Sequence, residues 1–171
     1  MAVHAFSNTR SEAHFSSCGN FRFWLCREWG VKNPFGVFLL SNPSYADALR
    51  LDTTTMICSN LAVLWGWRGF GIVNIIPAVS TAPINSATVT STIGAENDEW
   101  IIKSRSFSDV FVLAVGNDRH VEMQSAIKRL KLPGPFHSID KKNAEGGYPH
   151  PSSFKDRGKY PQTPNMISGS P

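Results

Sequence analysis

The chain has 171 residues, of which 42% are hydrophobic and 18% are charged. This length allows one domain with a sizeable core, and the composition excludes an intrinsically disordered chain. The formal net charge of +4 permits contact with nucleic acid or a nucleotide but does not require it.

Membrane, secreted and metal-binding classes find no support in the sequence. No stretch approaches the roughly 18 apolar residues of a membrane span, and residues 1–10 lack the apolar core of a secretory signal. We therefore expect a cytoplasmic protein with no membrane partner. The three cysteines form no Cys-x-x-Cys pair, and His137 and His150 are poorly spaced for a metal without a third ligand. We expect no metal and no cofactor.

The N-terminal region is expected to combine a loose start with one strand. Residues 1–14 show no hydrophobic period, so we predict a loose N-terminus there. Residues 21–26 alternate with period two, which is typical of an edge strand. Arg22 and Arg27 in this region are either surface charges or ligands of a phosphate.

Four apolar runs predict buried strands, and segments with helical spacing separate them. The runs cover residues 36–40, 70–76, 109–116 and 136–139, and the helical segments cover residues 53–65, 96–107 and 118–130. The alternation predicts an α/β fold, a three-layer α/β/α sandwich. Its central sheet is expected to be mostly parallel, with about four strands plus the N-terminal edge strand. We predict one domain over residues 15–154 and a flexible tail over residues 155–171.

Polar residues follow the ends of these predicted strands. The set comprises Asn42, Pro43 and Ser44 after the first run, Asn74 in the second, Gly116 and Asn117 after the third, and His150 and Ser152 beyond the fourth. The carboxyl ends of parallel strands meet at one edge of a sheet, where open α/β sheets bind ligands. The sequence therefore predicts that these residues form one pocket.

Each of these residues also has a plain structural explanation. Asn-Pro-Ser is a common turn sequence, Asn74 can satisfy its amide on neighbouring backbone, and His150 can be a surface loop histidine. Asp47 and Asp52 are either helix caps or groups that act as a general base or bind a cation. Lys141 either grips a phosphate or is simply solvated.

A pocket rich in amides and hydroxyls, with one imidazole, suits hydrolysis with an anionic leaving group. A nucleobase leaving a sugar is such a case, because the catalyst needs only to hold water and to stabilise the departing base. Tyr45, beside the first turn, can stack on a base. Dinucleotide, P-loop and α/β-hydrolase chemistry are unlikely on sequence grounds, because the chain has no Gly-x-Gly-x-x-Gly, Walker-type or Gly-x-Ser-x-Gly motif.

The order and spacing of the motifs resemble the bacterial and phage family known as domain of unknown function 1643, over about residues 15–154. The matching motifs include Asn42-Pro43-Ser44, Asp52-Thr53-Thr54, Gly94-Ala95-Glu96-Asn97-Asp98 and Pro149-His150-Pro151. Two positions depart from the family pattern. Tyr45 stands where the family has Thr, and Val115-Gly116 stands where it has Trp-Gly.

A more distant resemblance links Asn-Pro-Ser after the first strand, and His-Pro-Ser after the last, to the two active-site motifs of the uracil-DNA glycosylase superfamily. This resemblance implies a fold of that type. It also implies that Asn42 orients water and that His150 stabilises the leaving base, with Asn74 as a looser match for a base reader.

The leading hypothesis from the sequence is an N-glycosidase-like hydrolase that acts on a nucleobase in DNA or in a nucleotide. The alternative is a non-catalytic module of the same fold that binds a nucleotide or a modified base. A third hypothesis is a protein-interaction domain that uses the long loop over residues 78–94. A carboxylate placed to activate water would separate the first two hypotheses, and Asp47 is the nearest candidate.

Overall fold

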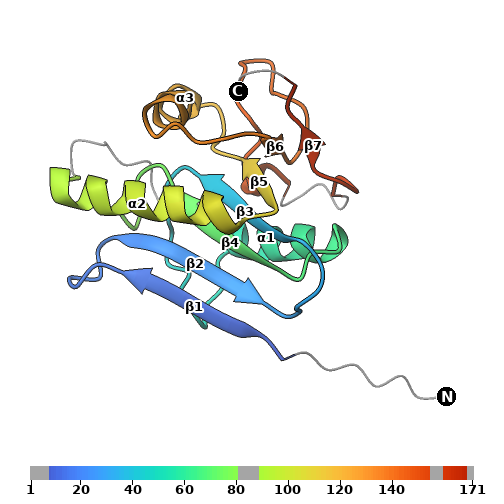
Figure 1. Ribbon diagram of the computed structural model, residues 1–171, viewed down its shortest axis with the longest axis horizontal. Coiled ribbons are helices and arrows are strands. Elements are labelled where there is room, and N and C mark those ends of the chain that lie inside the picture. The colour runs from blue at the N-terminus through green and yellow to red at the C-terminus, as the bar shows by residue number, and fades with distance from the viewer. Residues whose placement is uncertain (1–7, 81–88, 155–159, 169–171) are drawn as a thin grey trace.

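The computed structural model describes residues 8–80, 89–154 and 160–168. Its centre is a mixed seven-stranded sheet with the strand order β1-β2-β4-β3-β5-β6-β7 (Figure 1). The strands are β1 (Arg10–Phe15), β2 (Arg22–Glu28), β3 (Phe35–Leu40), β4 (Gly69–Asn74), β5 (Val110–Leu113), β6 (His137–Ser138) and β7 (Asn165–Met166). The helices are α1 (Thr53–Leu64), α2 (Ser91–Phe107), α3 (His120–Arg129) and the short 3-10 helix η2 (Pro151–Phe154).

The sheet contains more antiparallel strand pairs than the sequence predicted. The adjacent strands β4, β3, β5 and β6 pair in parallel, as expected for the four apolar runs. The pairs β1–β2, β2–β4 and β6–β7 are antiparallel. The expected sheet of about four strands plus one edge strand is therefore wrong in strand number and in overall parallel character, whereas the mixed α/β class is confirmed.

Helices cover both faces of the sheet. Ile57 and Leu61 of α1 pack with Phe38 of β3 on one face. Ile101 of α2 packs with Val37 of β3 on the other face, where α3 also lies. Figure 1 shows α2 in front of the sheet and α1 behind it. The alternation of side chains along β3 explains why this strand is apolar at every position.

The beginning of α1 follows the sequence prediction. Asp52 is its N-cap, and the carboxylate accepts a hydrogen bond of 2.6 Å from the Thr55 N–H. Gly66, with φ of +69°, follows the helix, which agrees with the expected helical segment over residues 53–65. By contrast, α2 begins earlier than expected, because the Thr90 hydroxyl caps a first turn at Ser91 that has no strong apolar period.

The N-terminal region differs most from prediction. Strand β1 pairs with the outer side of β2, so β2 is an internal strand rather than an edge strand. Its residue Arg22 is only 2% exposed, which excludes a surface charge. Residues 10–14, expected to be loose, therefore belong to the sheet.

The two expected loose segments and the long loop are only partly described. Residues 165–166 of the expected flexible tail form β7, which pairs with β6. Residues 1–7, 81–88, 155–159 and 169–171 lie outside the described residues, and they include residues 81–88 of the 78–94 loop. None of the helices within the described ranges is long and apolar enough to cross a membrane.

Candidate functional site

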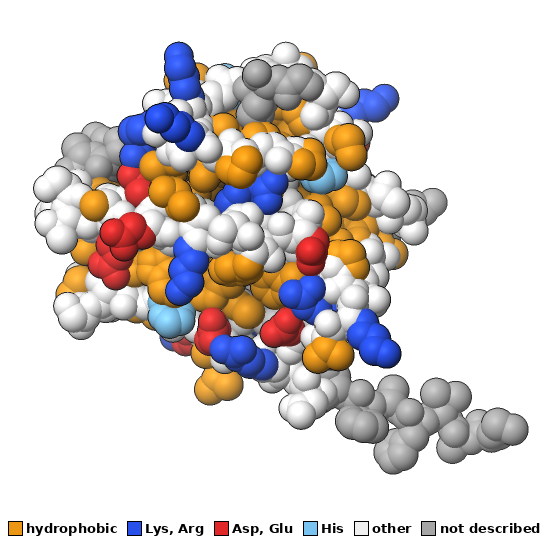
Figure 2. All heavy atoms as spheres, in the orientation of Figure 1, with side chains coloured by type: hydrophobic (Ala, Val, Ile, Leu, Met, Phe, Trp, Pro, Cys, Tyr) orange, Lys and Arg blue, Asp and Glu red, His pale blue; other side chains and the backbone are white. Residues whose placement is uncertain are grey.

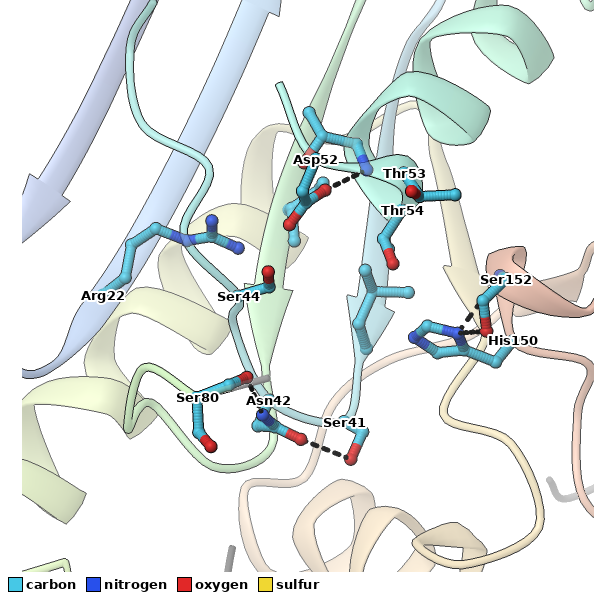
Figure 3. Close-up of a pocket in the computed structure, with 13 residues that line it drawn as sticks. Arg22, Ser41, Asn42, Ser44, Asp52, Thr53, Thr54, Ser80, His150 and Ser152 are labelled. Carbon is cyan, nitrogen blue, oxygen red and sulfur yellow. Dashed lines mark hydrogen bonds between the residues drawn. The ribbon is translucent and has the colours of Figure 1, made fainter. Parts of the chain in front are cut away.

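A polar pocket of about 330 Å³ lies where β3 ends and α1 begins (Figure 3). Its lining residues come from β2, β3, β4, α1, η2 and three loops. They are Arg22, Leu40, Ser41, Asn42, Ser44, Asp52, Thr53, Thr54, Thr55, Ile72, Ser80, His150 and Ser152. The volume lies at the lower end of the range of small-molecule sites, roughly 300–1,000 Å³.

Asn42 has a fixed amide orientation in this pocket. Its Nδ2 group donates to the Ser80 carbonyl oxygen at 3.0 Å. Its Oδ1 atom accepts a hydrogen bond from the Ser41 hydroxyl at 3.4 Å. A carbonyl oxygen has two lone pairs, so Oδ1 retains one acceptor position for a water or ligand in the pocket.

His150 presents a neutral N–H to the pocket. Its Nδ1 atom lies 2.8 Å from the Ser152 hydroxyl and accepts from the Ser152 backbone N–H at 3.2 Å. Because Nδ1 is an acceptor, the proton of the neutral ring is on Nε2, which points toward the pocket interior (Figure 3). Burial lowers the pKa of His150 to about 4, so the ring is uncharged at neutral pH.

The N-terminus of α1 forms another wall. Asp52 uses one carboxylate oxygen to cap Thr55, while Thr53 and Thr54 border the cavity. The first N–H groups of a helix lack partners within the helix and carry a partial positive charge. This wall therefore presents hydrogen-bond donors together with one carboxylate.

Arg22 closes the end of the pocket opposite His150 (Figure 3). Its guanidinium donates to the Ala46 carbonyl oxygen at 2.8 Å and, at a long 3.5 Å, to Asn74 Oδ1. Burial lowers the pKa of Arg22 to about 10, and the nearby charge of Asp52 opposes that effect. The side chain therefore remains a cation at neutral pH.

The structure brings together only some of the residues that the sequence predicted. Asn42, Ser44, His150 and Ser152 line the pocket. Three others support it from outside: Pro43 accepts from the Ser80 N–H at 2.8 Å, Asn74 contacts Arg22, and Gly116 lies against His150.

The other four predicted residues neither line the pocket nor contact the residues that do so in the way these three do. Asp47 accepts hydrogen bonds from the backbone N–H groups of Arg50 and Leu49, which lower its pKa to about 2. Tyr45 is 58% exposed, and Lys141 is also exposed. Asn117 forms hydrogen bonds with Asn143 and Glu145, and it therefore stabilises the loop that contains these two residues.

From the sequence, Arg22 was only an alternative phosphate ligand and Asp52 only an alternative general base, and neither Ser41 nor Ser80 was predicted at the site. Arg22 was the harder residue to find, although a single charge inside an aromatic and apolar segment was a usable signal. Asp52 was correctly predicted as a cap. Its position in the pocket depends on where α1 begins relative to the end of β3, which tertiary packing decides.

Among the described residues, no group of three or more His, Cys, Asp or Glu side chains could hold a metal ion. The donors at this site are amide, hydroxyl, imidazole and guanidinium groups, which suit an organic or anionic ligand better than a transition metal.

The chain matches the protein family described as "Protein of unknown function (DUF1643)" over residues 22–152. The chain belongs to this family. The matched segment begins at Arg22 and ends at Ser152, and it therefore contains every residue that lines the pocket. Searches of curated proteins and of solved structures give no match.

Proposed function

We propose that this protein is an N-glycosidase-like hydrolase that acts on a nucleobase in a nucleotide or in DNA. The observation that carries the proposal is the pairing of two preset groups in one pocket. Asn42 offers a fixed carbonyl oxygen, and His150 offers a neutral Nε2–H donor. The first group suits a water molecule and the second suits a base that departs with negative charge.

In the proposed reaction, the bond between the sugar carbon and the base nitrogen breaks, and the base leaves with the electron pair. The oxygen of a water molecule bonds to the same sugar carbon, and the proton that this water loses ends on the departed base. His150 donates a hydrogen bond to the departing base, while Asn42 Oδ1 accepts one from the attacking water. Asp52, rather than Asp47, is the carboxylate that we assign to take the proton of that water, because Asp52 lines the pocket and Asp47 does not. The sugar becomes cation-like, so a strong nucleophile is not needed.

The fold supports this proposal at the level of architecture. Four adjacent parallel strands lie between helices on both faces, and the motif residues Asn42 and His150 border a pocket beside their carboxyl ends. A three-layer arrangement like that of uracil-DNA glycosylases is part of the same proposal.

A non-catalytic binding module is the second candidate function. It is favoured by the role of Asp52 as an N-cap, because one of its two carboxylate oxygens is already engaged by the Thr55 N–H. In that case ligands would raise the melting temperature without being converted.

The test is to incubate the purified protein with nucleosides, nucleoside 5′-monophosphates and short DNA, and to measure released free base by chromatography. We expect Asn42→Ala and His150→Ala to lower base release at least a hundredfold while the proteins remain folded. Lys141→Ala is the matched control, because Lys141 is exposed and does not line the pocket. Full activity in a folded Asn42→Ala or His150→Ala variant would refute the role assigned to that residue.

A further inference from the structure

Arg22 is a buried cation, and the nearby opposite charge is that of Asp52. It forms no ion pair with any carboxylate in the described part of the chain, and its Nε atom has no hydrogen-bond partner there. Arg68, which lies at the start of β4, instead pairs with Glu28 at 3.1 Å and with Asp109 at 3.2 Å. Burying an unpaired charge is costly, so an anion from outside the chain would complete the environment of Arg22.

A β-bulge directs Arg22 into the pocket. His14 pairs with Trp24, but the next residue, Phe15, pairs with Arg22, which makes Phe23 an extra residue on β2. The bulge interrupts the alternation of side chains. As a result Arg22 reaches the α1 face of the sheet, whereas Trp24 packs on the α2 face.

The wall beside Arg22 is also built for an anion. Figure 3 shows the guanidinium directed toward Ser44 and Asp52, with Thr53 and Thr54 beyond them. The hydroxyls and the first N–H groups of α1 are further donors, and the positive end of the helix dipole points at the same space. Donors that converge from a guanidinium and a helix N-terminus match the several acceptor oxygens of a phosphate.

We propose that the Arg22 end of the pocket binds a phosphate group of the ligand. The inference rests on the proposed function in naming that ligand as a nucleotide, with its base at His150 and its phosphate at Arg22. The phosphate is either the terminal group of a mononucleotide or a phosphodiester of a nucleic acid, and both sources share this chemistry.

A substitution of Asp52 also tests the proposed phosphate site. Its charge repels a phosphate, yet its capping role does not depend on that charge, because Asn and Asp cap helices equally well. Asp52→Asn should therefore strengthen phosphate binding several-fold without loss of α1. Arg22→Gln should weaken it by about tenfold to a hundredfold, the range for losing a hydrogen bond to a charged group.

The experiment is calorimetric titration with inorganic phosphate, the 2′-deoxynucleoside 5′-monophosphates, the matching nucleosides, and an oligonucleotide without a terminal phosphate. We expect at least one monophosphate, or the oligonucleotide, to bind at least tenfold more tightly than the nucleoside. Arg22→Gln should abolish this preference. The control is Arg50→Gln, which removes an exposed arginine that does not line the pocket and should change nothing. Preference for the monophosphate identifies a terminal phosphate, and Arg22-dependent binding of the oligonucleotide identifies a phosphodiester.

Equal affinity for nucleosides and phosphorylated ligands would overturn the proposal, as would a folded Arg22→Gln variant that keeps the preference. If Arg22→Gln does not fold, an Asp52→Asn variant that fails to bind phosphate more tightly overturns it instead. Phosphate binding that depends on Arg22 without any base release would support the phosphate site and contradict the glycosidase. Base release at equal rates from nucleosides and nucleotides would support the glycosidase and contradict the phosphate site.

Discussion

The charged side chains at the two ends of the parallel strands differ in whether they form ion pairs within the protein. At the amino end, Arg68 bridges Glu28 and Asp109, and Asp109 also accepts from the Phe35 N–H at 2.7 Å. At the carboxyl end, Arg22 has no carboxylate partner among the described residues. The charges at the amino end are thus paired within the chain, whereas at the carboxyl end the proposed phosphate would pair with Arg22. This contrast underlies the expectation that substitutions at the pocket change ligand binding and that substitutions at the opposite end change stability.

Gly36→Ala should give the largest loss of stability. Gly36 lies near the amino end of β3, and an added Cβ would lie 1.9 Å from Trp67 Cζ3, so the buried indole ring would have to move. Overpacking of this kind costs roughly 1–3 kcal/mol, and we expect at least the upper value. Chemical denaturation measures the free energy of unfolding. The control Gly94→Ala has nothing nearer than 3.9 Å and lies within α2, so it should stabilise the protein. Equal stability of the two variants would contradict the packing at the amino end.

Arg68→Met should cost about 1–2 kcal/mol of unfolding free energy, because it leaves Glu28 and Asp109 without their shared cation. It should leave ligand binding at the pocket unchanged, since Arg68 is at the opposite end of the strands. Denaturation and phosphate titration of the same sample check both statements. Weaker phosphate binding in this variant would remove the functional distinction between the two ends.

The pH dependence of stability should report the burial of His150. Its pKa is about 4 in the folded protein and roughly 6.5 in an unfolded chain. The unfolded state therefore binds more protons between these values, and stability should fall as the pH decreases from about 6.5 to about 4. In His150→Gln this part of the decrease should disappear. Identical slopes for both proteins would show that the ring is not buried as described.

Asp47→Ala should have the smallest effect on function. The carboxylate only closes a local turn through the N–H groups of Leu49 and Arg50. Base release and phosphate binding should stay within about twofold of the wild type, in contrast to changes at Asp52. A large loss of base release in a folded Asp47→Ala variant would restore the role that the sequence suggested for it.

The sequence was most informative where local chemistry decides structure. The cap at Asp52, the stop of α1 at Gly66 and the four apolar runs all follow from short-range rules. The positions of Asn42 and His150 in one pocket follow from the rule for parallel strands.

The remaining features depend on contacts between distant segments. Nothing in residues 10–15 predicts that they cover β2, and without that pairing Arg22 looks like a surface charge. The bulge at Phe23 is likewise a property of strand pairing. Asp47 and Asp52 are both turn carboxylates in the sequence, and only the packing of α1 shows which of them reaches the pocket.

The proposed glycosidase activity is tested by measuring the free base that the wild type and Asn42→Ala release side by side from nucleotides and short DNA. We expect the wild type to release base from at least one of these substrates and Asn42→Ala, still folded, to release at least a hundredfold less. No release by the wild type from any of them, or equal release by both proteins, would contradict it.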